Sequence, residues 1–186
     1  EAALGYLKKN YTGQKFYHIG PPRDFDLFND FKNKKTEDLD KSDYLLCTGL
    51  YDQHDQDLNY YKELLKNFTS KKMVCTNPDL IVNKGKKREY CAGSVAMIFE
   101  KIGGEVIYFG KPYPEVYNQA IKSNKKKVIA IGDNLRTDIK GANNMNYDSL
   151  IITSGVHNEE FEKEGIEKVL KNYNAKATFS QSMLKW

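Results

Sequence analysis

The junction between one apolar run and the acidic loop after it constrains the fold more than any other stretch of this chain. Residues 127–130, Lys-Val-Ile-Ala, form a short apolar run bounded by a lysine cluster. This run predicts a buried strand of a parallel sheet. Residues 131–138, Ile-Gly-Asp-Asn-Leu-Arg-Thr-Asp, come next, and residues 139–144 are predicted to be helical. Asp133 and Asp138 therefore fall in a strand-to-helix loop, at the carboxyl edge where open α/β sheets bind ligands.

The two acids of this loop predict a site for a hard cation. Gly132 allows the backbone to turn sharply as it leaves the strand, so that Asp133 projects from the strand tip and Asp138 lies near the first helical turn. Carboxylate oxygens at such an edge suit Mg²⁺, which takes oxygen ligands and usually keeps some of its water. A turn residue and a helix cap are the alternative interpretation of the pair, since aspartate is common in both roles.

Strands alternate with helices along the chain, which predicts a parallel α/β architecture. The expected strands cover residues 15–19, 44–48, 72–75, 105–109 and 127–130, a strand that ends at residue 153, and a final short strand at 177–179. The expected helices cover residues 2–9, a short segment around 25–31, 57–68, 91–101, 114–122 and 139–144, and an acidic tail that continues to about residue 173. Residues 33–41 and the lysine-rich stretch after Asp79 are expected to be loops.

Composition narrows the classes of partner. The net charge of +4 is small and the lysines are dispersed, so nucleic acid is not an expected partner, although a mildly positive surface suits a phosphorylated substrate. No apolar run is long enough to cross a membrane, and no secretory signal peptide opens the chain. The three cysteines form no CxxC pair, so we expect buried, reduced thiols and a cytoplasmic location. The histidines have no metal-ligand spacing and are expected to be incidental: His18, His54 and His157.

Three segments together resemble one enzyme family. Gly-Asp-Asn-Leu-Arg-Thr-Asp-Ile, at residues 132–139, is similar to the fourth motif of the haloacid dehalogenase (HAD) superfamily, in the form typical of its class IIA, NagD-like phosphatases. Gly-Lys-Pro at 110–112 resembles the third motif, and Thr-Asn-Pro-Asp at 76–79 resembles a segment of the cap domain. The resemblance implies a Rossmann-like HAD core, present as a partial parallel sheet, with an α/β cap domain. Residues 1–103 would form the cap, and residues 104–186 the C-terminal half of the core.

The resemblance also implies roles for the residues of the third and fourth motifs. Lys111 would neutralise the phosphate and the attacking aspartate, because phosphoryl transfer depends largely on positioning and charge stabilisation. Asp133 would bind Mg²⁺, and Asp138 would support the metal or orient the lysine. Asn134 would help to shape the substrate site. A solvated surface lysine is the alternative interpretation of Lys111, since an isolated Gly-Lys-Pro is a weak signal.

The cap segment is assigned in the same way. Asn77 and Asp79 would face the substrate or the junction of cap and core. An Asn-Pro turn after a strand is the alternative interpretation of this segment, and the sequence does not choose between the two.

The family's nucleophile has no counterpart at an expected strand end. Asp-x-Asp, whose first aspartate attacks the phosphate and whose second acts as acid and base, ends the first core strand in the family. Here Asp-x-Asp occurs at residues 24–26, 38–40 and 55–57, and none directly follows an expected strand. We therefore expect the 186 residues to be inactive alone. Upstream residues outside this sequence, a shortened chain and a natural non-catalytic relative all remain open, and we favour the first two.

The sequence predicts a Mg²⁺-dependent phosphate monoester hydrolase that acts on a small sugar or nucleotide phosphate. Its partner would be a small phosphorylated metabolite, with neither nucleic acid nor membrane, and the resemblance leaves room for a homodimer formed through the cap. A non-catalytic ligand-binding or interaction domain derived from the same fold is the alternative. An unrelated nucleotide-binding α/β domain is disfavoured, because the chain has no glycine-rich phosphate fingerprint.

Overall fold

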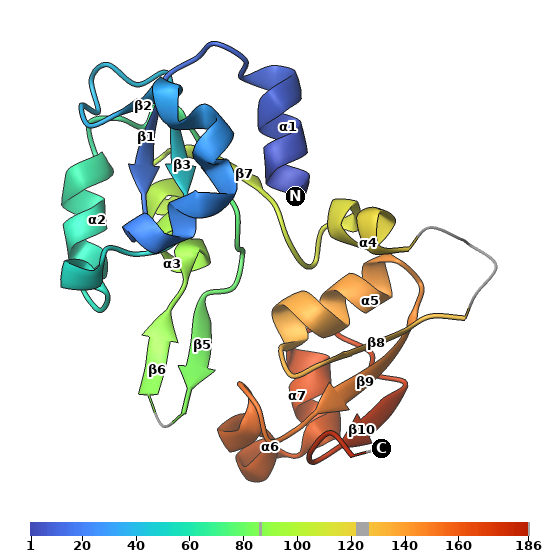
Figure 1. The fold of residues 1–186 in the computed structure, drawn as a ribbon. Coiled ribbons are helices and arrows are strands. Elements are labelled where there is room, and N and C mark those ends of the chain that lie inside the picture. The colour runs from blue at the N-terminus through green and yellow to red at the C-terminus, as the bar shows by residue number, and fades with distance from the viewer. Residues whose placement is uncertain (86, 122–126, 186) are drawn as a thin grey trace. The chain divides into compact units, whose positions relative to one another are not determined.

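The chain forms two compact units, Glu1–Gly110 and Lys111–Trp186, each with a parallel sheet of its own (Figure 1). The computed structural model describes residues 1–85, 87–121 and 127–185. The sequence predicted a division near residue 103, but the strand β7 (Glu105–Tyr108) pairs with β4 (Lys72–Cys75) in the N-terminal unit. The division therefore falls after Gly110, because β7 completes the sheet of the first unit.

The N-terminal unit is built on a five-stranded sheet of order β2-β1-β3-β4-β7, with every neighbouring pair parallel. The strands not yet defined are β1 (Phe16–Ile19), β2 (Lys35–Thr36) and β3 (Tyr44–Cys47). The central strands are apolar at every position or nearly so, which is typical of a parallel sheet covered on both faces. The predicted strands at 44–48 and 72–75 are confirmed.

Helices cover both faces of this sheet. The covering elements are α1 (Ala2–Asn10) and the 3-10 helix η1 (Pro22–Lys34) on one face, and α2 (Leu58–Leu65) and α3 (Ala92–Lys101) on the other. Side chains alternate between the two cores: Leu45 packs under α2 and α3, whereas Tyr44 and Leu46 pack with the aromatic residues of η1. A short 3-10 turn, η2 (Asp52–His54), precedes α2.

Three short strands lie in stretches that were predicted to be loops. The lysine-rich stretch expected to be a loop forms an antiparallel hairpin of β5 (Ile81–Lys84) and β6 (Lys87–Tyr90), and the polar stretch 33–41 contains β2. The hairpin was missed because most of its described side chains are exposed, so its sequence lacks the apolar alternation that marks a half-buried strand. β2 was missed because a strand of two residues is too short to show a pattern.

The C-terminal unit has a three-stranded parallel sheet of order β10-β9-β8. Its strands are β8 (Ile129–Gly132), β9 (Asp148–Ile152) and β10 (Phe179–Gln181). Its helices are α4 (Pro114–Ala120), the π-helical turn η3 (Leu135–Ile139), α5 (Lys140–Asn144), α6 (Asn158–Glu164) and α7 (Ile166–Asn172). The acidic tail expected to be one helix is broken at Gly165, whose φ of 81° favours glycine. Residue 122 of the expected helix 114–122 lies outside the described residues, as do two of the lysines that precede residue 127.

The strand before the acidic loop differs from its prediction in where it begins and in how far it is buried. It begins at Ile129, two residues later than expected, and Ile129 and Ile131 are 47% and 37% exposed. β9 pairs with one edge of β8, and no strand among the described residues pairs with the other edge. A strand with one free edge and a half-exposed face is not buried, which is the physical reason for the error.

Among the residues that the structure describes, none of the helices has the length and apolar character needed to span a bilayer.

Candidate functional site

The candidate site lies in the loop that joins β8 to η3. Asp133 comes directly after the last residue of β8, so it leaves the carboxyl end of the strand as the sequence predicts. Gly132 is required here by space, because a Cβ at this position would lie 2.2 Å from the carboxylate carbon of Asp138. The loop therefore closes over the carboxylate of Asp138 and brings both acids to one edge of the sheet.

Asp138 is the centre of this loop. Its Oδ2 accepts the backbone N–H groups of Asp133 and Asn134, at 3.1 and 3.0 Å. Its Oδ1 pairs with the ammonium group of Lys111, and the residue is only 7% exposed. Because both carboxylate oxygens are engaged by groups of the protein, this geometry favours a residue that orients the loop and the lysine rather than a metal ligand.

Lys111 presents a positive charge at this edge. Its side chain remains 46% exposed although its ammonium group pairs with the buried carboxylate of Asp138. An exposed ion pair contributes little to stability, but a lysine held by a buried, oriented acid keeps its charge at a defined place. Such a charge can meet an anionic group that approaches from solvent.

Asp133 differs from Asp138 in having one uncommitted oxygen. Its Oδ2 accepts the backbone N–H of Val156 at 3.0 Å, from the loop that follows β9. A Cβ on Gly155 would lie 2.1 Å from the same oxygen, so only glycine allows this approach. Its Oδ1 accepts no hydrogen bond from the described part of the chain, and the residue is partly exposed. This oxygen can serve as a ligand.

The donor set fits Mg²⁺ only in its hydrated form. Among the described residues, no group of three or more histidine, cysteine, aspartate or glutamate side chains could hold a metal ion. Mg²⁺ is commonly held by one or two carboxylates, with waters and substrate phosphate completing its octahedron. The free oxygen of Asp133 beside the cationic Lys111 suits that mode of binding, whereas a cage made of protein ligands alone does not fit these residues.

Asn134, predicted to contact substrate, is turned into the protein. It is 8% exposed, and its side-chain oxygen accepts the backbone N–H of Arg136 at 3.0 Å, which caps the π-helical turn. In this structure Asn134 shapes the loop that carries Asp133 and Asp138.

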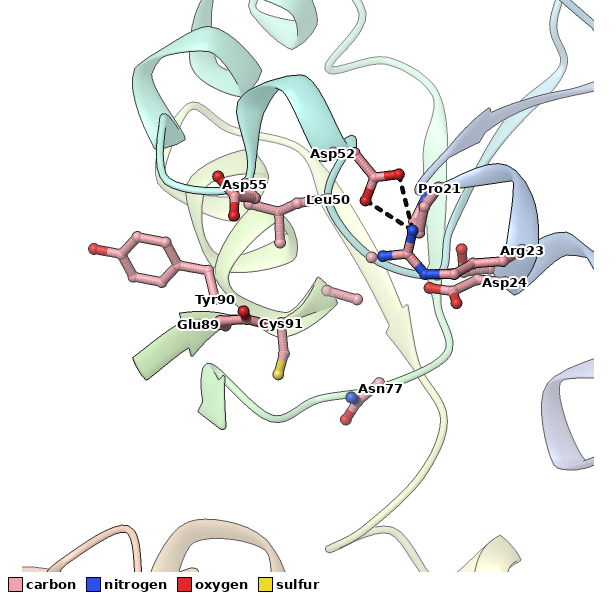
Figure 2. Close-up of a pocket in the computed structure, with 13 residues that line it drawn as sticks. Pro21, Arg23, Asp24, Leu50, Asp52, Asp55, Asn77, Glu89, Tyr90 and Cys91 are labelled. Atoms are coloured by element: carbon pink, nitrogen blue, oxygen red, sulfur yellow. Dashed lines mark hydrogen bonds and ion pairs between the residues drawn. The ribbon is translucent and has the colours of Figure 1, made fainter. Parts of the chain in front are cut away.

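Asn77 and Asp79, also predicted to contact substrate, lie in the N-terminal unit after β4. The side-chain oxygen of Asn77 accepts the backbone N–H of Asp79 at 3.1 Å, so the segment does form an Asx turn. Asn77 also lines a pocket of about 260 Å³ (Figure 2). The turn and the ligand-facing position are therefore compatible.

This pocket gathers polar residues from the carboxyl ends of three parallel strands. Arg23 and Asp24 come after β1, Asp52 after β3 and Asn77 after β4. One guanidinium nitrogen of Arg23 donates to both carboxylate oxygens of Asp52, at 2.8 Å each (Figure 2). Burial raises the pKa of Asp24, and the nearby carboxylate of Asp52 adds to that rise, while Arg23 opposes it. The pocket therefore offers several hydrogen-bond acceptors to a ligand.

Several groups of the pocket and of the Asp133 site were not predicted from the sequence. Asp24 was set aside because no expected strand directly precedes it, although Gly20 and Pro21 after the first strand were a signal that its loop lies at the carboxyl edge. Val156 was missed because it acts through its backbone N–H, for which the side chain gives no sign. Gly155, directly before it, was the available signal, since a glycine after a strand often marks a close approach.

The candidate site lies within the part of the chain that a protein-family model matches. Residues 108–176 match a protein-family model described as HAD-hydrolase-like. The ribonucleotide monophosphatase NagD of Escherichia coli (strain K12) is 30% identical over 89 residues, which is 46% of this chain and 34% of NagD. The dihydroxyacetone phosphatase of Corynebacterium glutamicum (strain R) is 28% identical over 92 residues, which is 47% of this chain and 34% of that protein. The chain is related to the NagD-like HAD phosphatases.

Solved structures agree with this family. A haloacid dehalogenase-like hydrolase from Brucella suis 1330 matches 84% of this chain and 60% of its own, with a TM-score of 0.75 and 28% identity. The p-nitrophenyl phosphatase from Archaeoglobus fulgidus matches 97% of this chain and 68% of its own with a TM-score of 0.66, and at 16% identity it supports the fold alone. The predicted family and α/β fold class are confirmed. The chain spans about a third of the length of the curated relatives it matches, at 34% of each.

Proposed function

We propose that this chain contributes a cap and the C-terminal half of the core to a Mg²⁺-dependent phosphate monoester hydrolase of the NagD-like type. Its substrate would be a small phosphorylated metabolite, such as a sugar or nucleotide phosphate. The observation that carries the proposal is the Lys111–Asp138 pair beside Asp133 at the tip of a parallel strand. A positive charge, a buried acid that holds it and a partly free carboxylate suit phosphoryl transfer, where catalysis is mostly positioning and charge stabilisation.

Each residue of the site has a physical task in this proposal. Lys111 attracts and neutralises the phosphate, and Asp138 holds its ammonium group in place. The free oxygen of Asp133 would be the ligand through which the chain holds Mg²⁺. When bound, the metal ion would supply positive charge to the phosphate oxygens. In the N-terminal unit, Asn77 and Asp79 would take part in recognising the substrate.

We also propose that these 186 residues are incomplete for catalysis. Among the described residues, no Asp-x-Asp follows a strand of the C-terminal unit. Ile129 and Ile131 are half-exposed and lie on β8. No strand among the described residues pairs with the outer edge of β8. A further strand from outside this sequence would cover that edge and could bring the attacking aspartate beside Asp133. The homodimer and the cytoplasmic location stay predictions.

The test is an assay of p-nitrophenyl phosphate hydrolysis by the 186-residue chain and by the full-length gene product. We expect Mg²⁺-dependent turnover by the full-length protein and none by the chain alone. Asp133→Asn in the full-length protein should lower kcat by at least about 100-fold, since the metal would lose its carboxylate ligand. Asp148→Asn, at the exposed start of β9, is the matched control and should leave turnover unchanged. Unchanged turnover in Asp133→Asn would remove the metal assignment.

A non-catalytic ligand-binding domain of the same fold is the second candidate. It is favoured by the pocket of the N-terminal unit, whose lining comes entirely from that unit. This alternative expects the full-length protein to bind small metabolites without hydrolysing any phosphate ester at saturating Mg²⁺. Hydrolysis of one member of a panel of sugar and nucleotide phosphates would exclude it.

A further inference from the structure

The loop after β9 holds Asp133, and its own support lies in a buried cluster. The backbone N–H of Val156 reaches Asp133 Oδ2, so the orientation of that loop decides where the carboxylate points. The next residue, His157, is only 4% exposed. From the sequence this histidine was expected to be incidental, but a buried ring beside the residue that holds Asp133 is a structural anchor.

His157 is anchored by Glu160. Its Nδ1 lies 2.8 Å from Glu160 Oε1, and because a carboxylate can only accept, Nδ1 carries the hydrogen. Its ring packs edge-on against Tyr173, with ring centroids 4.7 Å apart, and its Nε2 is buried without a hydrogen-bond partner among the described residues. With Nε2 unpartnered, the contact with Glu160 is the hydrogen bond that fixes the orientation of the ring.

Glu160 also reaches the loop that carries Asp133 itself. The Tyr173 hydroxyl donates to Glu160 Oε1 at 3.1 Å, and the guanidinium of Arg136 lies over the Tyr173 ring, 5.0 Å from its centroid. Arg136 belongs to η3, three residues after Asp133. One carboxylate thus connects both loops that border Asp133, through His157 on one side and through Tyr173 and Arg136 on the other.

The charge state of Glu160 agrees with this arrangement. Its partial burial alone would raise its pKa, but the hydrogen bonds from His157 and Tyr173 outweigh that effect, and the pKa is lowered. The carboxylate is therefore ionised at neutral pH, when it is the strongest acceptor for both donors.

We propose that Glu160 is a positioning residue for Asp133, because it fixes the loop whose Val156 N–H holds that carboxylate. The inference rests on the proposed function, in which Asp133 is the Mg²⁺ ligand. The competing explanation is local: Glu160 is the third residue of α6 after its N-cap residue, His157, where a glutamate commonly stabilises a helix start. A capping role alone changes the stability of α6 and leaves the Val156 contact intact.

Hydrogen exchange of the Val156 amide in the ¹⁵N-labelled chain separates the two explanations. In Glu160→Gln we expect this amide to exchange about tenfold faster, as for the loss of one hydrogen bond to a charged group. Tyr173→Phe removes one donor and no charge, and should show a smaller increase. The matched control is Glu159→Gln, which changes the same charge one position away on an exposed side chain of α6. It should leave Val156 unchanged.

Two outcomes are decisive. If Val156 keeps its wild-type exchange rate in a folded Glu160→Gln while the amides of α6 exchange faster, Glu160 is a helix cap and the proposal is overturned. If Glu160→Gln does not fold, Tyr173→Phe decides by the same readout. A Mg²⁺ titration of the same samples tests the proposed function separately. An apparent Kd for Mg²⁺ that is weakened about tenfold in Glu160→Gln agrees with the metal assignment of Asp133 and with the positioning role of Glu160. No response of Asp133 in the wild type contradicts the metal assignment, while the Val156 rates still decide the role of Glu160.

Discussion

The two units of this chain carry stability and chemistry in different ways. In the N-terminal unit the central strands are buried on both faces, and each face has its own core of large apolar side chains. In the C-terminal unit the described residues form one buried cluster, around Leu135 and Ile151, and the outer strand β8 is half-exposed. The candidate site belongs to this second unit, where hydrogen bonds and ion pairs between loops hold the side chains. We therefore expect apolar truncations to damage the first unit most, and polar substitutions to damage the site of the second.

The largest expected effect comes from emptying the N-terminal core. Phe99 is fully buried, and its ring occupies the space that a side chain at Gly104 would need. Phe99→Ala should lower the free energy of unfolding of this unit by about 3–5 kcal/mol, because a cavity remains where the ring was. Urea unfolding followed through hydrogen exchange of the β4 amides measures it. Phe179→Ala, in the exposed strand of the other unit, is the control and should change little; equal losses for both would refute the contrast in packing.

A pH dependence should follow from His18, which is buried in the N-terminal unit and hydrogen-bonded to Thr48. Burial, with Lys35 as a smaller cause, lowers the pKa of His18 from 6.5 to about 4. The unfolded chain then binds a proton that the folded unit refuses, so stability is complete above pH 6.5 and falls as the pH drops towards 4. The loss amounts to at most about 3 kcal/mol.

His18→Gln should flatten this pH profile of unfolding, since glutamine can still bond Thr48 but does not titrate. His54→Gln, another histidine of the same unit, should leave the profile as in the wild type. A profile that stays steep in His18→Gln would assign the pH dependence to other groups.

The next effect concerns chemistry rather than stability. Asp138→Asn removes the charge that holds Lys111, and it places an amide where the carboxylate accepts two backbone N–H groups. We expect kcat of the full-length protein to fall by about 100-fold, a size typical for the loss of one preorganised electrostatic group. Asp148→Asn serves again as the control. A normal kcat with lowered thermal stability would show that Asp138 is only structural.

The smallest effects come from two glycines, one in each unit. Gly5 lies in α1 with open space around it, so Gly5→Ala should stabilise the N-terminal unit by about 0.5–1 kcal/mol. Gly155→Ala has no such space, because the new Cβ would meet Asp133, and it should weaken Mg²⁺ binding about tenfold. Thermal unfolding and a Mg²⁺ titration of both variants measure this. The opposite pattern would mean that Gly155 has no part in placing Asp133.

The same contrast explains how much could be predicted from the sequence. β3 and β4 were found within one residue because strands buried on both faces are continuous apolar runs. The β5–β6 hairpin was missed because most of its described side chains are exposed. The burial of β8 was predicted wrongly, since burial depends on what pairs with its outer edge and not on its own four residues.

The candidate site was predictable only in part, for a similar reason. Asp133 and Asp138 could be found from the local motif, and Lys111 through the family resemblance. The contact that Val156 makes was signalled only by Gly155 before it, because a backbone N–H leaves no mark of its own in the sequence. The anchoring by Glu160 could not be found, because a glutamate in an acidic helix resembles its solvated neighbours.

The most direct test of the central claim is a titration of the ¹⁵N-labelled chain with Mg²⁺ and then inorganic phosphate. The account predicts shift changes in the loop of Asp133 and Asp138, at Val156 and at Lys111, with Asp133→Asn abolishing the response to the metal. The titration needs no catalytic turnover, so it can be made on these 186 residues as they stand. Changes confined to the pocket around Asn77, or no response of the Asp133 loop at millimolar Mg²⁺, would contradict the assignment of the C-terminal unit as the place where phosphate and metal bind.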